Sequence, residues 1–463
     1  MARTAKNEKA LTPEEKLVQA LVPEMEQPYL VPENWCWTTV GAINNYVGNS
    51  VDPLKEPDSI FELYSVPSSA ENFPELIEGK EIGSTKQSVK KGDVLLCKIN
   101  PRINRVWHVA QHTDHPLIAS SEWIVIRNIQ ISSKYLMWCM RSGYFREYML
   151  SNVSGVGGSL MRAQPKHVRG YPIPLSPLAE QQRIVDRIEN LFAQLDEAKE
   201  KAQAVVDGFE DRRAAILHKA FTGELTEVQR KKRGVGLDSW DPVTLKDIVS
   251  GFKYGTSEKS DYSFTGMPVL RIPNIGDDGI DFSDIKKLSS ETVEAANQIH
   301  ENDILIIRSN GSRDLVGKCA LVPQLDQEYA YASFLIRIKP SERVRAEYLV
   351  LFLNSADARA QMFAKSKSSA GINNINSKEL GAVLLKLPEL WEQEEITHQV
   401  SKLLLLEKQA KEAAEQVIDQ IDAMKKSILA RAFRGELCTN DPADESAEEL
   451  LKRTLNRSDA YDS

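Results

Sequence analysis

The sequence predicts an α+β protein built as two copies of one plan, a globular domain followed by a long helix. The stretch from Leu178 to Leu225 returns from Leu390 to Leu437 at a constant offset of 212 residues, with 18 of the 48 aligned positions identical. Apolar residues in both stretches follow a helical spacing, and the segments before them carry short strand-like runs bounded by turns. One repeat of this length indicates duplication of a whole unit rather than a solenoid.

The repeated stretch places apolar residues alternately three and four positions apart, which is typical of a coiled-coil helix. A continuous helix from Ile184 to Phe221 would be about 56 Å long at ~1.5 Å per residue. Glu407 is the one interruption of the apolar series in the second copy, and Gly223 and Gly435 have the position of helix C-cap glycines.

Both apolar stripes extend beyond what one small domain would cover, so we expect the two helices to pack on each other. The alternative is that each helix lies on the surface of its own domain. Small alanines at mid-length would allow the two backbones to approach closely. The residues expected to pair are Ile184, Ile188, Leu191, Ala198, Ala202 and Val205 in the first helix and Ile396, Val400, Leu403, Ala410, Ala414 and Val417 in the second.

The composition indicates an ordinary soluble protein large enough for several domains: 463 residues, 42% hydrophobic and 27% charged. No apolar run approaches the length of a membrane span and no signal-peptide pattern is present, so the sequence predicts neither membrane insertion nor export. The five cysteines are scattered and contain no Cys-x-x-Cys pair, which favours a reducing cytoplasm and gives no zinc motif. The net charge of −8 conceals any local basic surface.

The order of segments follows from the repeat. Thr12-Pro13-Glu14-Glu15 has the form of a helix-capping box, and the last residues are acidic and polar, so we expect a mostly solvated terminus with at most a short helix through Leu450 and Leu451. The predicted segments are a leader (1–30), a first globular domain (31–174), a first helical segment (175–235), a second globular domain (236–386), a second helical segment (387–438) and a polar acidic tail (439–463).

The two globular domains share their opening residues and one strand but little between these anchors. Trp35 and Trp240 stand at matching places, and strand 92–96 corresponds to strand 302–305. A strand over 123–126 and a helix over 133–150 are also expected in the first domain. The same fold with different loops is what two domains of different specificity require.

Known catalytic signatures fail when the residues are compared with the pattern. The run Gly311–Cys319 has five residues between its glycines and ends in cysteine, so it departs from the phosphate-binding loop. Gly155-Val156-Gly157 lacks the third glycine of a dinucleotide fingerprint, and the three histidines between 108 and 115 have no further ligand cluster, which favours solvated loop histidines over a metal site. We therefore predict a non-catalytic chain with no catalytic residues and no metal site.

Polar stretches at the ends of matched strands are suited to contacts with DNA. Arginine can bond bidentately to guanine and asparagine to adenine in the major groove, whereas lysine and serine serve phosphates better. A solvated polar loop remains the alternative for each stretch taken alone. The candidate DNA-binding residues in the first domain are Lys98, Asn100, Arg102, Asn104, Arg105, Arg162 and Gln164. Those in the second are Lys253, Tyr254, Thr256, Ser257, Lys259, Arg271, Asn274, Arg308, Ser309, Asn310, Ser312, Arg313, Asn373 and Asn374.

This pattern resembles the specificity subunit of bacterial type I restriction–modification enzymes. The residues that carry the resemblance are the run Pro174–Val185 (Pro-Leu-Ser-Pro-Leu-Ala-Glu-Gln-Gln-Arg-Ile-Val) and Ala220-Phe-Thr-Gly-Glu-Leu225, repeated at Leu387–Ile396 and Ala432–Leu437. The resemblance covers nearly the whole chain apart from residues 1–30 and 440–463. The second copy departs from the first at Trp391, where the first has Ala179.

The resemblance implies that the globular domains are target-recognition domains and that the two helices pair antiparallel. Each domain would then read one half of a split, asymmetric sequence in double-stranded DNA. Two methyltransferase subunits would dock on the helices, and two ATP-driven restriction subunits would join them. S-adenosylmethionine, ATP and Mg²⁺ are then expected on these partners, with no cofactor bound by this chain.

Charge counts qualify this expectation. The first domain has 15 Lys and Arg against 13 Asp and Glu over residues 30–174, and the second has 18 against 20 over residues 236–386. Because phosphate neutralisation needs many cations, we expect the isolated chain to bind DNA weakly. Two other functions stay open from the residues alone: a coiled-coil adaptor that does not read DNA, and an enzyme with an unrecognised site.

Overall fold

The computed structural model describes residues 12–151, 153–154, 161–291, 293–294, 297–365, 367–369 and 372–458. Residues 1–11 of the leader, the glycine-rich run 155–158 and residues 459–463 of the tail lie outside the described residues. The chain divides into two compact units, one formed by residues 1–201 with 417–463 and the other by residues 202–416. We call them unit 1 and unit 2. Each contains one globular domain together with parts of both long helical segments.

Unit 1 holds the first globular domain, whose strands form a five-stranded sheet (β2-β5-β8-β3-β4), a three-stranded sheet (β7-β6-β9) and two strand pairs, β1-β12 and β10-β11. The opening strand pairs antiparallel with the strand that leads into the long helix, Cys36 opposite Leu175. The strands are β1 Cys36–Thr39, β2 Ser50–Val51, β3 Ile60–Tyr64, β4 Glu75–Glu78, β5 Lys86–Ser88, β6 Val94–Cys97, β7 Val106–His108, β8 Leu117–Ala119, β9 Trp123–Ile126, β10 Val153–Ser154, β11 Arg162–Ala163 and β12 Pro172–Leu175.

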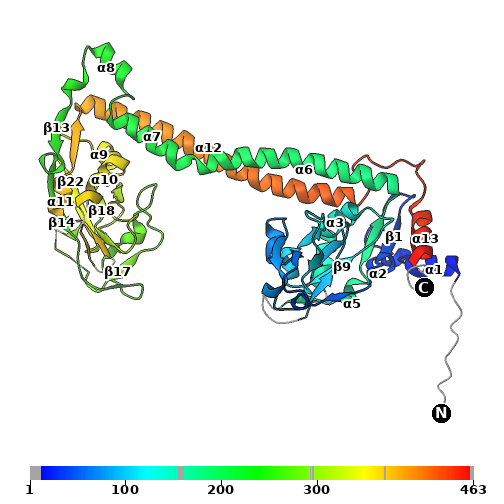
Figure 1. Ribbon diagram of the computed structural model, residues 1–463. Helices are drawn as coiled ribbons and strands as arrows, with labels where there is room; N and C mark the ends of the chain where they lie inside the picture. Colours follow the sequence, from blue (N-terminus) through cyan, green and yellow to red (C-terminus); the bar gives the residue numbers. More distant parts are fainter. Residues whose placement is uncertain are drawn as a thin grey trace. The chain divides into compact units, whose positions relative to one another are not determined.

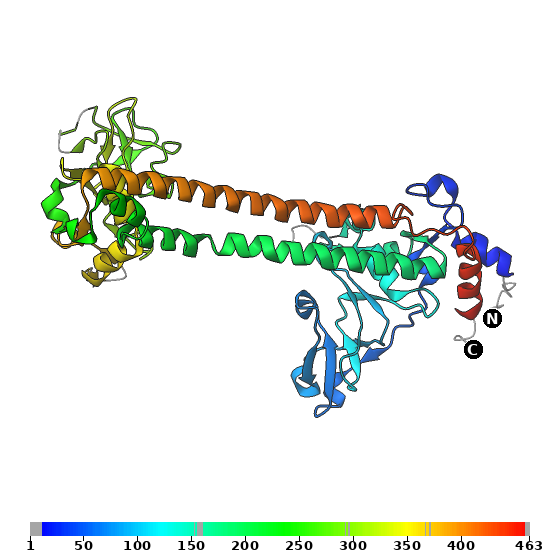
Figure 2. The ribbon, with the colours of Figure 1, turned by 90° about the horizontal axis from the view of Figure 1, so that it is seen from above.

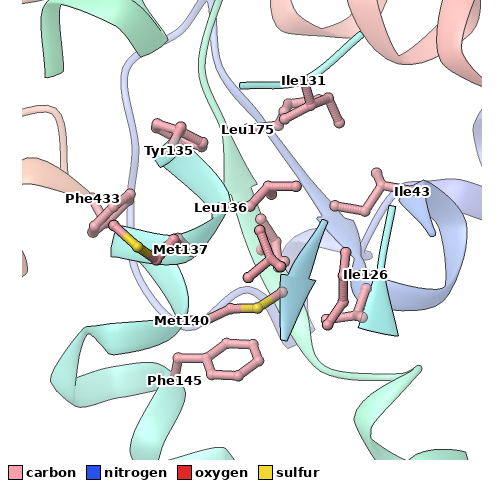
Figure 3. Close-up of a cluster of buried hydrophobic side chains, with 14 of the residues drawn as sticks. Ile43, Ile126, Ile131, Tyr135, Leu136, Met137, Met140, Phe145, Leu175 and Phe433 are labelled. Carbon is pink, nitrogen blue, oxygen red and sulfur yellow. The ribbon is translucent and has the colours of Figure 1, made fainter. Parts of the chain in front are cut away.

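The helices of unit 1 pack on the three-stranded sheet and on the ends of the long helices (Figure 1). They are α1 Pro13–Ala20, α2 Val40–Ile43, α3 Ser133–Arg141, α4 Gly143–Ser151, α5 Pro165–Val168 and α13 Ala447–Ser458. Figure 3 shows the core, where Leu136, Met140 and Phe145 from α3 and α4 meet Ile126 of β9, and Phe433 lies beside Tyr135. The ring centroids of Tyr135 and Phe433 are 5.3 Å apart.

Unit 2 repeats this plan with its own loops. Its sheets have the orders β14-β22-β18-β20, β15-β17-β16-β21 and β19-β24-β23, and the pair β13-β25 corresponds to β1-β12. The strands are β13 Asp241–Thr244, β14 Val249–Tyr254, β15 Ser260–Asp261, β16 Pro268–Leu270, β17 Lys286–Leu288, β18 Ile304–Ile307, β19 Ser309–Asn310, β20 Cys319–Leu321, β21 Ala330–Tyr331, β22 Leu335–Pro340, β23 Lys367–Ser369, β24 Ile372–Asn374 and β25 Leu384–Leu387. The shorter helices are α8 Glu227–Arg233, α9 Ala346–Leu353, α10 Ala356–Lys365 and α11 Ser377–Gly381.

The long helical segments are α6 Leu178–Asp207 with α7 Phe209–Phe221, and α12 Leu390–Ala432. They run antiparallel to each other within each unit (Figure 2). In unit 1, Lys199 Nζ lies 2.7 Å from Asp422 Oδ1, while Lys425 pairs with Asp196 one turn earlier on α6. In unit 2, Arg212 Nε lies 2.6 Å from Glu407 Oε2. The predicted α+β class with two long helices packed together is confirmed.

The expectation of one continuous helix from Ile184 to Phe221 is wrong, because the helix is interrupted at Gly208. The Val205 carbonyl accepts a hydrogen bond from Arg212 Nη2 at 2.7 Å, which takes the place of the next turn's amide. A Cβ atom on Gly208 would lie 2.5 Å from Arg212 Nη1. The interruption thus coincides with the guanidinium that pairs with Glu407, and a larger residue at 208 would have to displace the end of that side chain. By contrast, α12 is continuous over 43 residues.

Two further expectations need correction. The helix expected over 133–150 is divided at Ser142 into α3 and α4. The polar tail is also more than a solvated terminus, since α13 buries Ala447, Leu450 and Leu451 in the core of unit 1. Its acidic composition concealed an amphipathic helix that packs against α1. The leader's capping box on Thr12 and Glu15 is confirmed, and Gly223 and Gly435 have φ of +81° and +75°, as C-cap glycines require.

Candidate nucleic-acid interface

In unit 1, the candidate residues between Lys98 and Arg105 form the loop that joins β6 to β7. Asn100 and Asn104 adopt left-handed backbone angles, with φ of +45° and +50°, which asparagine tolerates better than most residues. Asn104 Nδ2 also donates to the Met140 carbonyl at 3.2 Å. These two asparagines therefore shape the loop, and the exposed Arg102 between them is the side chain best placed to reach a ligand.

The fold brings a distant part of the chain beside this loop. The Asn100 amide donates to the Met161 carbonyl at 2.9 Å, and the Ala163 amide donates to the Lys98 carbonyl at 2.8 Å. Candidates Arg162 and Gln164 therefore border the loop, a proximity that the sequence alone did not predict. Arg162 Nη1 lies 3.2 Å from Glu122 Oε1, and Lys98 Nζ donates to the Ser121 carbonyl at 2.6 Å.

In unit 2, the structure gathers candidates from three separate stretches around Arg308. The Arg308 guanidinium carbon lies 4.6 Å from the ring centroid of Tyr254, and Arg308 Nη2 donates to Asn374 Oδ1 at 3.4 Å. The Tyr254 hydroxyl is fixed in turn by the Ser377 amide at 3.0 Å. Ser309 pairs with Asn374 across β19 and β24. An aromatic face and an amide thus hold the arginine fork in one orientation.

The candidate loop over 253–259 is partly strand, because Lys253 and Tyr254 end β14 opposite Arg337 and Ile336. The backbone of Thr256 lies against β21, because its amide donates to the Tyr331 carbonyl at 2.9 Å. Ser257 and Lys259 are exposed.

Asn274 does not fit the role of a base-reading residue. It is 1% exposed, and its amide nitrogen donates to the carbonyls of Asp281 and Asp284, both at 2.9 Å. Its Oδ1 accepts from the Arg271 amide at 2.8 Å. All of its bonding capacity thus serves the local turn, which corrects the sequence expectation. Arg271 itself is largely buried beside Asp284, 3.3 Å from Oδ1.

The remaining candidates of unit 2 lie on the turn after β19 and on β24. Asn310 Oδ1 accepts from the Ser312 amide at 2.7 Å, and Asn373 Nδ2 donates to the Gly311 carbonyl at 3.4 Å. The exposed Arg313 lies with its guanidinium carbon 5.0 Å from the Phe363 ring centroid. They extend the polar surface that begins at Arg308.

The helix-pairing candidates fall into three groups. Completely buried are Ile184, Ile188, Ile396 and Val400, and nearly buried are Ala202 and Ala414. Leu191, Val205 and Leu403 are half-buried. Ala198, Ala410 and Val417 are exposed, so they lie outside the buried seam, contrary to expectation. The physical reason is that two helices cover only a narrow stripe of each other, and near Ala198 the contact is made by the Lys199–Asp422 pair.

A buried carboxylate at the start of each long helix was missed by sequence reasoning. In unit 1, Glu180 accepts from Trp35 Nε1 at 2.7 Å, from Asn440 Nδ2 at 2.9 Å and from Thr439 Oγ1 at 3.1 Å. In unit 2, Glu392 accepts from Trp240 Nε1 at 2.8 Å, from Thr226 Oγ1 at 2.6 Å and from Arg230 Nη1 at 2.6 Å.

The two carboxylates have equivalent roles, because Glu180 and Glu392 are 212 residues apart in the repeat. Each ties the opening tryptophan of its domain to the segment that follows the other long helix. The identity of the Glu-Gln pair in both copies was the signal that would have revealed them. The neighbouring glutamines complete the junction, since Gln181 Oε1 accepts from the Ser132 amide and Gln393 Oε1 from the Arg345 amide.

Among the described residues, no group of three or more His, Cys, Asp or Glu could hold a metal ion. Burial raises the pKa of the Cys36, Cys139 and Cys319 thiols to about 12, so these thiols stay protonated and are poor nucleophiles. In the same described part of the chain, every helix is too short or too polar to cross a bilayer.

A family model for the type I restriction modification DNA specificity domain matches residues 238–416. The chain is also similar to the specificity subunit of the type I restriction enzyme EcoKI from Escherichia coli (strain K12), with 29% identity over 309 residues. The chain is thus similar to the type I restriction–modification specificity subunits. The match spans 66% of this chain and 66% of the EcoKI subunit, just under two thirds of that relative. Specificity subunits confer DNA recognition and are the non-catalytic part of these systems.

Solved structures share the fold. The HsdS subunit from Thermoanaerobacter tengcongensis gives a TM-score of 0.63 at 21% identity, covering 89% of this chain and 100% of that one. A chain from a structure of complex assembly and conformational transition of the type I restriction–modification system gives 0.71 at 22% identity, with the same coverage. Specificity subunits therefore share the alternation of β-rich domains and long paired helices seen in this chain.

Proposed function

We propose that each globular domain of this specificity subunit reads one half of a split DNA target, while the paired helices set the separation of the halves. The observation that carries the proposal is the duplicated junction at Glu180 and Glu392, where a buried carboxylate at the start of one long helix binds the opening tryptophan of each domain. Two readers that must enter the groove in phase need a stiff connection of this kind. We name residues 31–174 recognition domain 1 and residues 236–386 recognition domain 2.

In recognition domain 2, the readout centres on Arg308. A guanidinium held by Tyr254 and Asn374 keeps further N–H groups for a bidentate contact with the O6 and N7 atoms of guanine. Asn373 and Asn310 on the adjoining strands have the chemistry for adenine. In recognition domain 1, Arg102 within the β6–β7 loop and Arg162 beside it supply the equivalent contacts.

The reaction itself belongs to the partners in this proposal. Two methyltransferase subunits dock on the helical segments and use S-adenosylmethionine, and two restriction subunits use ATP and Mg²⁺ in the cytoplasm. The second helical segment carries exposed Leu405 and Leu406, apolar side chains that a docked subunit would cover.

The test is methylation mapping in cells that carry the chain with its methyltransferase subunit. Replacing Arg308 with alanine should either abolish methylation of the wild-type target or remove the preference for guanine at one position in one half of the target. The reason is that one good bidentate contact discriminates between bases by about 1–3 kcal/mol. Arg308→Lys should retain charge but not the fork, and should relax the same position. The matched control is Arg343→Ala, which removes a 52% exposed arginine elsewhere on the same domain.

Two outcomes would contradict the proposal. An unchanged methylated motif and rate with Arg308→Ala would favour an adaptor that does not read DNA through this surface. Methyl transfer by the purified chain alone would favour an enzyme.

The spacing role of the helices has its own test. Four residues inserted between Ala198 and Asp207, with four inserted at the facing part of α12, should lengthen the unread gap while both half-sites stay the same. An unchanged gap would refute the spacing role.

A further inference from the structure

Unit 1 contains an open cavity of about 820 Å³ between recognition domain 1 and the two long helices. It lies among the β6–β7 loop, the α3–α4 corner, α6 and the last turns of α12. Five cations line it against one carboxylate, Asp196, and every lining residue belongs to the described part of the chain. The lining cations are Arg105, Arg141, Arg146, Lys425 and Lys426.

Two of the five cations, Arg141 and Lys425, lie against aromatic rings. The Arg141 guanidinium donates through Nη2 to the Val106 carbonyl at 2.7 Å and lies 5.1 Å from the Trp138 ring centroid. Lys425 lies 5.1 Å from the Phe192 ring centroid and is paired with Asp196, so the other four lining cations have no carboxylate among the lining residues left to balance them. An excess of positive charge on a chain of net charge −8 indicates an anionic ligand.

The cavity recurs in unit 2 at the equivalent place, with a volume of about 850 Å³. Arg146 and Arg359 are each the fourth residue of α4 and α10, and Lys425 and Arg213 are 212 residues apart in the repeat. Unit 2 differs in charge, because its cavity is lined by three carboxylates beside four cations. Lys318 Nζ lies 2.9 Å from Asp277 Oδ1, which takes up part of its charge.

Both cavities adjoin the loops that carry candidate DNA contacts. Asn104 and Arg105 line the first cavity and Arg313 lines the second. Arg146 Nη2 also donates to the Arg102 carbonyl, which links the first cavity directly to the β6–β7 loop. A basic site beside a base-reading loop is where a flanking backbone phosphate would lie.

We propose that the unit 1 cavity binds a phosphodiester of the DNA backbone next to the half-site read by recognition domain 1, through Arg146, Lys425 and Lys426. The unit 2 cavity does the same more weakly, because its own carboxylates compete for its cations. This inference rests on the proposed function, since it assumes that recognition domain 1 faces DNA. It adds a sequence-independent grip that the residues around Arg308 do not provide.

The experiment measures DNA affinity of the assembled methyltransferase complex as a function of salt. Lys426→Gln, at an exposed position, and Arg146→Gln should each reduce the slope of log affinity against log salt by about 1. When the salt concentration rises four-fold, the affinity of a variant that has lost one contact should therefore fall by about 3–4-fold less than the affinity of the wild type. The methylated motif should not change with Lys426→Gln, and Arg146→Lys should keep the wild-type slope.

Matched controls come from the duplication. Arg359→Gln in unit 2 should reduce the slope by less than Arg146→Gln, and Lys402→Gln, exposed on α12 outside both cavities, should leave it unchanged. Unaltered slopes with Lys426→Gln and Arg146→Gln would overturn the inference.

Two other results would also overturn it. Loss of methyltransferase subunits from Arg146→Gln, seen by native mass spectrometry, would assign the cavity to an acidic protein segment. An altered motif with Lys426→Gln would assign it to base reading. If the wild-type complex itself shows no sequence-specific binding, the proposed function fails instead, which is a distinct outcome.

Discussion

Replacing Glu392 with glutamine should destabilise unit 2 far more than the equivalent replacement of Glu180 destabilises unit 1. Both carboxylates are buried, with 1% and 0% of their surface exposed. They differ in their partners, because Glu392 is paired with Arg230, whose side chain is 4% exposed, whereas tryptophan, threonine and asparagine donate to Glu180. The substitution preserves shape at both sites and removes only the charge.

The magnitude follows from these partners. Glutamine at position 392 leaves the Arg230 guanidinium buried without a counter-charge, which costs about 3–5 kcal/mol. At position 180 the donors are neutral, and an imperfectly replaced acceptor costs about 1–3 kcal/mol. The opening equilibrium of α8, which carries Arg230, should therefore rise by about two to four orders of magnitude with Glu392→Gln.

The assay is hydrogen exchange of the full-length chain, followed in peptides from α8 and from the first turns of α12. These peptides should lose protection with Glu392→Gln and keep it with Glu180→Gln, which should act on the region around Trp35 instead. A loss below about 1 kcal/mol for Glu392→Gln, or equal effects at both sites, would refute the assignment of a buried charge pair to this junction.

Three further perturbations test other parts of the fold. Phe433→Ala should cost unit 1 about 3–5 kcal/mol in chemical denaturation, and Phe221→Ala should cost unit 2 less because Phe221 is only partly buried; equal costs would contradict the packing. Gly208→Ala should displace the Arg212 guanidinium, and Arg212→Ala should leave the Val205 carbonyl unpaired at a cost of about 1–3 kcal/mol. In both variants the protection of α7 against hydrogen exchange should fall. Unchanged protection would refute the role of Arg212 as hydrogen-bond partner of the Val205 carbonyl. Burial opposes ionisation of Glu62, but hydrogen bonds from a tyrosine hydroxyl, a threonine hydroxyl and two loop amides outweigh it and hold the Glu62 pKa below its usual range. The ionised Glu62 therefore stabilises the fold above about pH 4.3, and this stabilisation is lost as the pH falls further. Glu62→Gln should flatten this part of the curve of stability against pH, and an unaltered curve would contradict the role.

Much of the architecture was readable because helical periodicity and internal repetition are local properties of a sequence. The apolar spacing gave α12 almost to its ends, and the capping box at Thr12 gave the start of α1. The interruption at Gly208 was not readable, since it depends on Arg212 meeting Glu407 from the other helix. The acidic composition of the tail likewise concealed α13, whose buried face is defined only by the α1 and α2 surfaces it meets.

The candidate interface divides in the same way. Residue types and strand ends located the polar stretches, because arginine and asparagine after a buried strand are visible in the sequence alone. Tertiary structure decided which of these residues can contact DNA. The Arg308 guanidinium lies on the Tyr254 ring in one orientation, whereas the Asn274 side-chain amide donates to backbone carbonyls of its own turn.

The sequence by itself determined that the chain is duplicated, that each half joins a mixed domain to a long helix, and that the whole resembles a specificity subunit. These conclusions rest on periodicity, offset and motif, which survive without coordinates. Only the tertiary structure decided how each domain is fixed, because Glu180 and Glu392 bind segments more than 140 residues away in the chain. It also decided where positive charge concentrates, since the cations of the unit 1 cavity come from four elements that no local pattern connects.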